Sequence, residues 1–443
     1  MKKKVILLSA GFLAGIIFSL PRADEKIVSF ISFLFQKSLD PYFWSQGLQL
    51  FGAELALLCF LFFISTFIKN KRLSEIIFPV GVYGLFFSYL FLQACNAPIN
   101  DDITTVFSFS NAWHDASSFS EKMNVLFSFH GECRLVFTRL FVLFFQFVSG
   151  AINIKTMLLF SNLCLILIFL LFKKNALKIP EKKFLLIFSG LLLFQFSFYD
   201  SIVWFTDALH YQYVVLFFLL FLTFLTGKKK YSTPLSVLFA VMACLTFGNG
   251  FLCFPIAILY CVVNKNFRHL FYWSIALICT AGFYFHNFPL QDSTFAWTNC
   301  WKIPVYSCCF VGGSFQFFQN LWLPFLAGLS VWILLFILIK KKYYQSNFFI
   351  FAVLLFVCFS SLIAGIFRIN SGISEAISNR YGFFSILAFI ASVIALTEIS
   401  LPEKKNKILK IAATAAVLFY LMSAVFFYPE IPVRKKKLEK FIS

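Results

Sequence analysis

The segment Pro79–Thr105, PVGVYGLFFSYLFLQACNAPINDDITT, joins an apolar run to two adjacent acids, Asp101 and Asp102. The run, residues 75–95, is long enough to cross a bilayer as a helix, which takes about 20 residues. Comparable runs recur along the chain, whose 443 residues are 60% hydrophobic and only 13% charged. Soluble domains carry roughly a quarter of charged residues. The sequence therefore predicts an all-α protein, a polytopic transmembrane helix bundle.

The apolar runs give about 11–14 predicted spans. The first, MKKKVILLSAGFLAGIIFSL, has the basic start of a signal peptide. Because a poor cleavage site follows it, we interpret it as a retained span. We expect a transmembrane hairpin over 1–70, a transmembrane core over 71–400, and a last span with a basic tail over 401–443. The remaining predicted spans are 48–68, 75–95, 134–150, 154–172, 183–200, 208–226, 234–247, 250–263, 269–285, 320–339, 347–366, 382–399 and 408–427.

Basic residues outnumber acidic ones and give a net charge of +19. A nucleic-acid partner is not indicated, because the lysines form short runs between apolar blocks, as the positive-inside rule predicts for a membrane protein. With those runs inside, the main outer loops are 96–133, 286–319 and 367–381. Two features do not fit this alternation. The run at 134–150 gives one crossing too many and is expected to lie partly in the interface, and the tail VRKKKLEKFIS is basic although counting places it outside.

Arginine is distributed differently from lysine. Only eight of the 38 basic residues are Arg, and four of them fall at predicted outer ends of spans: Arg134, Arg139, Arg368 and Arg380. Arg offers a planar fork of donors that binds phosphate at two points and stays charged. These positions therefore suggest an anionic ligand such as a lipid-linked phosphate. The alternative is contact with ordinary lipid headgroups.

The loop 96–133 contains the densest group of polar side chains. Residues 103–129 mix apolar and polar residues and predict one or two amphipathic helices on the bilayer surface. The ends of the loop would then meet, bringing Asp101 and Asp102 toward His130, Glu132 and Arg134. An acid pair can supply a general base and a group that positions it or holds a metal ion. The simpler interpretation is that two Asp residues end a helix and begin a loop.

Several short motifs resemble one family. INDDIT, FHGECRLVFTRL, LTFGNGFLCFPIAIL, FYFHNF and SNRYGFFSIL are similar to elements of integral-membrane glycosyltransferases of the GT-C superfamily. Within this superfamily, the motifs resemble those of bacterial O-antigen-modifying (serotype-converting) glucosyltransferases and related membrane proteins. The chain departs from that pattern in two ways. Its acid pair follows the third predicted span instead of the first, and GECR stands where a GR element is expected.

The resemblance implies a GT-C-like bundle with an amphipathic first catalytic outer loop. It implies transfer of a sugar from a polyprenyl-phosphate donor to a hydroxyl of a glycan or lipid-linked acceptor, at the outer side of the bacterial inner membrane. Asp101 or Asp102 would be the catalytic base. No organic cofactor is implied, and a divalent cation is an open option. The substrate-binding positions would be His130, Glu132, Arg134, Arg368, Arg380 and Tyr381.

Two other functions compete with this one. An O-antigen polymerase would share the spans and the outer arginines, but the chain lacks a large polar outer loop late in its sequence. A flippase or transporter of lipid-linked oligosaccharides would need charges deep within several spans, and only Glu54 is a clear candidate. The segment FGNGF, Phe247–Phe251, also has two interpretations: a helix broken at membrane depth beside Asn249, or two short helices joined by an outer turn.

Overall fold

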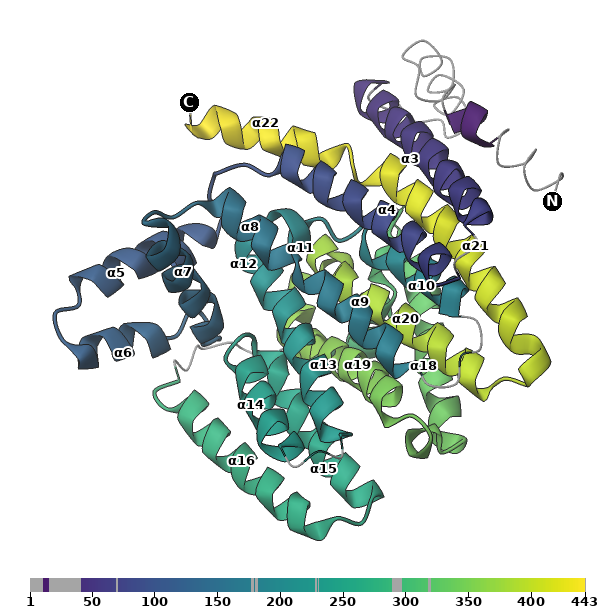
Figure 1. Ribbon diagram of the computed structural model, residues 1–443. Coiled ribbons are helices and arrows are strands. Elements are labelled where there is room, and N and C mark those ends of the chain that lie inside the picture. The colour runs from purple at the N-terminus through teal and green to yellow at the C-terminus, as the bar shows by residue number, and fades with distance from the viewer. Residues whose placement is uncertain are drawn as a thin grey trace. The chain divides into compact units, whose positions relative to one another are not determined.

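The computed structural model describes residues 11–15, 41–68, 71–176, 179, 182–227, 229, 231–288, 297–317 and 320–442 (Figure 1). Within these ranges the chain is helical, and the sole β-type contact is an isolated bridge between His130 and Cys133. The predicted all-α class is confirmed. Of the predicted first span, only residues 11–15 are described. Residues 289–296 and 318–319 of the predicted loop 286–319 also lie outside the described ranges.

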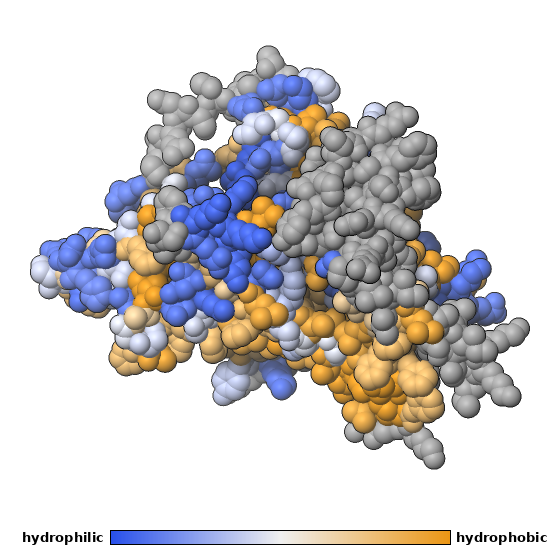
Figure 2. All heavy atoms as spheres, turned by 90° about the horizontal axis from the view of Figure 1, so that it is seen from above, coloured by the Kyte–Doolittle hydropathy of each residue, from blue (hydrophilic) through white to orange (hydrophobic). Residues whose placement is uncertain are grey.

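Seven of the described helical segments are long and apolar enough to cross a bilayer: Ile76–Gln93, Ile154–Asn175, Phe205–Leu225, Trp322–Lys340, Phe348–Ser371, Asn379–Ile399 and Pro402–Lys440. Five shorter apolar helices accompany them: Gln49–Ser65, Val136–Ser149, Lys183–Leu193, Ser232–Cys244 and Gly248–Val263. Figure 2 shows broad apolar areas, in orange, beside blue hydrophilic patches on the face turned to the viewer. The chain is a multi-pass helical membrane protein, and the predicted number of spans stays a prediction.

The chain forms two compact units, and the first combines three separate segments: Met1–Cys95, Lys178–Tyr199 and Leu396–Ser443. Its helix α3 packs against α4 and α21, and α10 packs against the same two helices. Phenylalanine rings fill the space between them; Phe86 stacks on Phe196 with centroids 4.8 Å apart. The helices of this unit are α3 (Pro41–Phe67), α4 (Lys71–Gln93), α10 (Lys182–Leu193), α21 (Pro402–Phe426) and α22 (Glu430–Ile442).

The basic tail forms helix α22, and it lies beside the C-terminal end of α4. Lys435 Nζ donates a hydrogen bond of 2.9 Å to the Leu92 carbonyl, one residue before α4 ends. The tail and that end of α4 therefore share one side of the unit. The sequence predicts that this end of α4 lies outside. The basic tail therefore lies on the side that the counting of spans also predicts to be outside.

The second unit comprises Asn96–Leu177 and Asp200–Ala395. Its most buried helices are α13, α19 and α20. Helix α17 packs tightly on α18 because Gly328 faces it: a Cβ at Gly328 would lie 1.8 Å from the Cys308 carbonyl oxygen. The elements are η1 (Ile103–Ser108), α5 (Phe109–Asp115), α6 (Phe119–Phe127), α7 (Val136–Ser149), α8 (Ile154–Asn162), α9 (Cys164–Asn175), α11 (Asp200–Val203), α12 (Phe205–Asp207), η2 (Ala208–Tyr213), α13 (Val214–Leu225), α14 (Ser232–Cys244), η3 (Gly248–Leu252), α15 (Cys253–Val263), α16 (Phe267–Phe285), η4 (Trp297–Lys302), α17 (Ile303–Val311), η5 (Gly313–Phe315), α18 (Trp322–Lys340), η6 (Tyr343–Gln345), α19 (Phe348–Arg368), η7 (Ile369–Ser371), η8 (Ile373–Ile377), η9 (Asn379–Tyr381) and α20 (Gly382–Ile399).

The loop 96–133 contains helices, as the sequence predicts. Helices α5 and α6 follow η1, and α6 begins with a capping box in which Ser118 and Glu121 satisfy each other's backbone amides. Helix α7, which follows, has 14 residues. At 1.5 Å per residue its length is about 21 Å, less than the roughly 30 Å of a bilayer core. The expectation that 134–150 lies partly in the interface stays a prediction.

Candidate functional site

The two adjacent acids have opposite environments. Asp101 is exposed, whereas Asp102 is fully buried. Asp102 Oδ2 accepts a hydrogen bond of 3.0 Å from the Ile99 amide. Its Oδ1 accepts two from Thr206, at 2.9 Å from the amide and 2.5 Å from the hydroxyl. The buried acid therefore fixes the loop to α12, and the exposed acid is left accessible beside it.

Burial raises the pKa of Asp102 to about 6, and the hydrogen bonds from Thr206 and the Ile99 amide offset part of the rise. Removing a carboxylate from water disfavours its charged form, while donors aimed at the oxygens favour it. A carboxyl with such a pKa changes charge close to neutral pH. Its protonation state therefore responds to small changes around it.

Two π-helical turns meet at this point, η1 directly after the acid pair and η2 directly after Asp207, the neighbour of Thr206. The hydroxyls of Thr105 and Thr206 lie 2.8 Å apart and join the two segments. A π-turn widens the helix and redirects side chains, and such turns are frequent at functional sites. Here they direct the acid pair and the polar residues of η2 toward one region of the second unit.

Asp207 and His210 contribute to the same region. Asp207 is buried, and its carboxyl lies within electrostatic range of Arg380, Asp200, Asp102 and Asp101. His210, three residues later, is also buried and lies nearly parallel to the Phe247 ring, with centroids 5.6 Å apart. The charges of Asp101 and Asp102 act on Asp207 although about a hundred residues separate them in sequence, and the charge of His130 acts on His210.

Arg380 is a cation whose charge acts on Asp207. Its guanidinium forms an ion pair with Glu375, and its backbone carbonyl accepts a hydrogen bond of 2.9 Å from Ser201 Oγ. The guanidinium carbon lies 5.4 Å from the centre of the Tyr381 ring. The Ser201 contact connects η9 to α11, so the arginine is held against the segment that carries Asp207.

Arg368 is more exposed and stands at the C-terminal end of α19. Its charge acts on the hydroxyls of Tyr381, Tyr211 and Tyr306, and on Arg380. The two predicted arginines therefore belong to one electrostatic group with Tyr381. We refer to Asp101, Asp102, His130, Asp207, His210, Tyr211, Arg368, Arg380 and Tyr381 together as the polar cluster.

Several buried polar atoms of this region have no hydrogen-bond partner within the described part of the chain. They are Asp207 Oδ2, His210 Nε2, Arg380 Nε and the hydroxyls of Tyr306 and Tyr381. Native proteins pair nearly all buried polar groups, since an unpaired one costs about 1–3 kcal/mol. A concentration of them, with donors, acceptors and both charges, is the arrangement expected where a polar ligand or ordered water binds.

The predicted substrate-binding residues divide into two groups. His130 is half-buried, and burial lowers its pKa while the nearby Asp101 carboxylate acts in the opposite direction. Glu132 is exposed. The structure thus brings His130, Arg368, Arg380 and Tyr381 together with the acid pair, and Glu132 stays at the surface of the loop.

Arg134 is oriented differently. Its Nε donates to the Tyr284 carbonyl at 2.7 Å, and its two terminal nitrogens donate to the carbonyls of Phe127 and His286. Arg139 similarly donates to Leu126 and Ser128 carbonyls, at 2.8 and 2.6 Å. Each guanidinium therefore ties backbone segments together. This arrangement explains two of the outer arginines without a ligand.

The segment FGNGF interrupts the helix, as the sequence predicts. Helix α14 ends at Cys244, and the 3-10 turn η3 precedes α15. A Cβ at Gly250 would lie 2.2 Å from the backbone carbon of Ala243, so only glycine allows the turn to fold back on α14. Asn249 donates to Ser360 Oγ at 3.2 Å, and its Oδ1 is buried without a partner among the described residues.

No group of three or more His, Cys, Asp or Glu side chains in the described ranges has the arrangement of a metal site. The acids of the polar cluster are instead accompanied by Arg380. The open option of a divalent cation stays a prediction.

Sequence reasoning did not assign Asp207 and His210 to the site. The missing signal was the register of η2, because a π-turn changes which residues share a face. The Tyr306 hydroxyl, which has no partner among the described residues, also has no sequence signal, since nothing local distinguishes Tyr306 from other interfacial aromatic residues.

No protein-family model, curated protein or solved structure matches this chain.

Proposed function

We propose that this protein is a membrane glycosyltransferase of the GT-C type. It moves a sugar from a polyprenyl-phosphate donor to a hydroxyl of a cell-surface glycan, such as O antigen, at the outer side of the bacterial inner membrane. The observation that supports this proposal is the polar cluster: an accessible acid, a buried acid that holds its loop, and Arg380 among unpartnered polar atoms. A base beside an anion-binding group is what such a transfer requires.

The reaction is a single displacement. Asp101 accepts the proton of the acceptor hydroxyl as its oxygen forms a bond to the anomeric carbon. The bond between that carbon and the phosphate oxygen breaks, and polyprenyl phosphate leaves with the electron pair. Asp101 is assigned the base because it is exposed, whereas three hydrogen bonds occupy Asp102. Asp102 is a positioning residue in this scheme.

Arg380 stabilises the leaving phosphate, and Arg368 contributes from the end of α19. The Nε of Arg380 and the Tyr381 hydroxyl, which have no partner among the described residues, offer donors for phosphate or sugar oxygens. Preorganised donors of this kind are worth several kcal/mol, about 10²–10³ in rate for each one removed. Arg134 is left out of the scheme because backbone carbonyls occupy its guanidinium.

The test replaces Asp101 and Asp102 separately by Asn and follows transfer from a radiolabelled polyprenyl-phosphate sugar in membranes with matched protein levels. Asp101→Asn is expected to reduce kcat by about 10²–10⁴-fold, the usual contribution of a general base. Asp115→Asn is the matched control, since Asp115 is an exposed acid on the same loop. Full transfer by Asp101→Asn would overturn the assignment of the base. Absence of transfer from polyprenyl-phosphate sugars by the wild-type protein would overturn the proposed function.

A further inference from the structure

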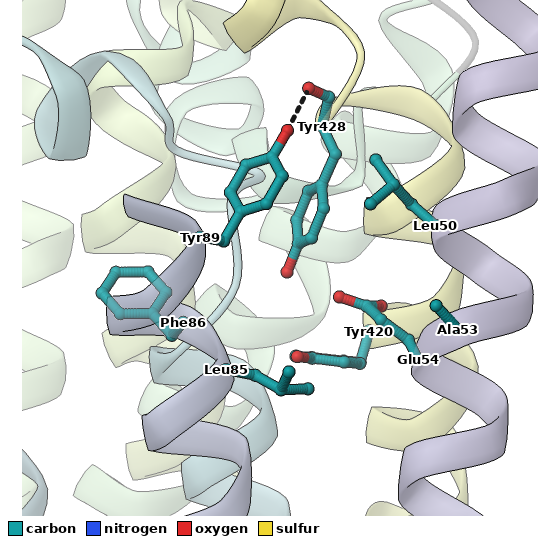
Figure 3. Close-up of a pocket in the computed structure, with 8 residues that line it drawn as sticks. All are labelled: Leu50, Ala53, Glu54, Leu85, Phe86, Tyr89, Tyr420 and Tyr428. Carbon is teal, nitrogen blue, oxygen red and sulfur yellow. Dashed lines mark hydrogen bonds between the residues drawn. The ribbon is translucent and has the colours of Figure 1, made fainter. Parts of the chain in front are cut away.

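A second polar site lies in the first unit, apart from the residues of the proposed reaction. A cavity of about 100 Å³ lies between α3, α4 and the C-terminal part of α21 with the residues just after it (Figure 3). Four of its lining residues are apolar: Leu50, Ala53, Leu85 and Phe86. The other four carry polar atoms: Glu54, Tyr89, Tyr420 and Tyr428. Figure 3 shows the Glu54 carboxyl from α3 and the Tyr420 and Tyr428 hydroxyls directed toward one another.

Glu54 is the only acid of this lining, and it is 6% exposed. The hydroxyls of Tyr428 and Tyr420 hydrogen-bond to its carboxyl. Its Oε2 nevertheless has no partner among the described atoms. No Lys, Arg or His in the described ranges forms an ion pair with it. The carboxyl therefore lacks the positive charge that buried acids normally acquire.

The tyrosines form a fixed wall around this acid. The Tyr89 hydroxyl donates a hydrogen bond of 3.0 Å to the Tyr428 carbonyl, and the two rings stack with centroids 5.1 Å apart. Phe196 packs edge-on against Tyr89, also at 5.1 Å. Because these contacts hold the rings in place, the cavity does not depend on a rearrangement to form.

A carboxylate surrounded by aromatic rings matches one class of ligand. Ammonium groups bind over the faces of Tyr rings, and an acid beside the rings neutralises their charge. A hard metal ion such as Ca²⁺ takes 6–8 oxygen ligands, more than this lining supplies. We propose that the cavity binds one small ammonium group, with an N–H directed at Glu54 Oε2 and the tyrosine rings around it.

Such an ammonium has two sources, the ethanolamine headgroup of a phospholipid or a soluble amine. One feature distinguishes them chemically. Lys435 on α22 lies against the Leu92 carbonyl, three residues after Tyr89 on α4. A lipid would therefore meet a cation for its phosphate near the cavity, and a soluble amine would not use it.

The experiment uses the full chain in nanodiscs of phosphatidylglycerol alone. Ethanolammonium is titrated into one sample, and phosphatidylethanolamine replaces part of the lipid in another; thermal unfolding and native mass spectrometry report binding. Wild-type protein is expected to gain thermal stability in at least one arm. If Lys435→Gln weakens only the stabilisation by phosphatidylethanolamine, the source is the lipid headgroup. If ethanolammonium stabilises this variant as it does the wild type, and phosphatidylethanolamine stabilises neither, the source is a soluble amine. Both results support an ammonium site.

Glu54→Gln keeps the shape of the side chain and removes its charge, so we expect an apparent Kd at least about tenfold weaker, since loss of one partner of a buried charge pair is costly. Glu398→Gln is the control, because Glu398 is a second buried acid of the same unit outside this cavity. Tetraethylammonium is a control that needs no variant. Because it is too large for the cavity, we expect it not to stabilise the wild-type protein. Wild-type protein indifferent to both amine sources, or Glu54→Gln binding as tightly as wild type, would overturn the proposal and leave a water-filled cavity.

Discussion

Asp102 in the second unit and Glu54 in the first are both buried acids, yet they differ in whether positive charge accompanies them. Asp102 has N–H and O–H donors on both oxygens and belongs to a cluster that contains Arg380. Glu54 has two tyrosine hydroxyls, one oxygen without a partner in the described structure, and no ion pair there. A buried acid costs free energy in either place. What differs is the charge that remains to be neutralised.

This difference separates the two sites by the ligand each can accept. In the polar cluster, cations already accompany the acids, so an added anion meets Arg380 and Arg368 while an acid remains available for a proton. In the tyrosine-lined cavity no cation of the described residues pairs with the acid, so an added cation is favoured. Removing the positive charge from the polar cluster is the most direct test of this comparison.

Replacement of Arg380 by Gln is expected to have the largest effect. In the proposed reaction the variant loses the charge that stabilises the leaving phosphate, and we expect transfer to fall by about 10²–10³-fold, as for removal of one preorganised donor. Arg380→Lys keeps the charge but not the fork, so it should recover only part of the rate. Initial rates of transfer from the polyprenyl-phosphate sugar measure both variants.

Loss of activity by unfolding has to be separated from loss of the charge. Arg268→Gln serves as the control, because Arg268 is an exposed arginine of the same unit. If Arg380→Gln transfers sugar at the wild-type rate, the polar cluster does not use Arg380 as an anion site, and the contrast with Glu54 disappears.

The pH dependence of stability tests the buried acid of the polar cluster. The pKa of Asp102 is raised from 3.8 to about 6 by burial, so the folded chain holds this proton more tightly than the unfolded chain. As pH rises from about 4 to above 6, the unfolded chain ionises first and stability is lost. At 1.36 kcal/mol per pKa unit, the loss through Asp102 is about 3 kcal/mol.

Thermal unfolding of detergent-purified protein between pH 4 and 7.5 measures this loss. Asp102→Asn should flatten the part of the profile between pH 4 and 6, because an amide does not titrate. Identical profiles for wild type and Asp102→Asn would show that Asp102 does not control stability in this range.

Thr206→Val sharpens the role of the donors around the same acid. The substitution removes the hydroxyl that donates to Asp102 Oδ1 at 2.5 Å and leaves the amide donor in place. A hydrogen bond to a charged group contributes about 1.5–3 kcal/mol. We expect a lower melting temperature at pH 7, and Thr206→Ser should restore it.

Thr104→Val is the matched control for this substitution. Thr104 lies two residues after Asp102, is exposed, and bonds only to the Asp101 carbonyl at 3.1 Å within the described contacts. Equal destabilisation by Thr104→Val and Thr206→Val would mean that the effect reflects a general loss of threonine and not the support of Asp102.

The sequence allowed the helical membrane class to be predicted because apolar length is a property of one segment at a time. Residues at the ends of apolar runs could also be identified from the sequence, and six of these belong to the polar cluster: Asp101, Asp102, His130, Arg368, Arg380 and Tyr381. The sequence did not predict that Asp101 is exposed and Asp102 buried, because Asp102 is held by Thr206, which lies 104 residues away. The capture of Arg134 by distant carbonyls and the tyrosine wall around Glu54 likewise arise from contacts between separate segments.

The smallest effect is expected where hydrogen bonds are exposed. Ser118 caps α6 by accepting a 3.2 Å hydrogen bond from the Glu121 amide, and both side chains face solvent. Ser118→Ala removes the cap at a cost of about 1 kcal/mol. Hydrogen exchange of the α6 amides should accelerate by about fivefold, the factor that 1 kcal/mol represents at 25 °C, while transfer activity stays unchanged. Ser108→Ala, which removes an exposed serine on η1 without a capping role, should not alter exchange in α6. Loss of transfer in Ser118→Ala would mean that α6 is part of the catalytic arrangement, and that exposed hydrogen bonds of the loop matter as much as the buried ones around Asp102.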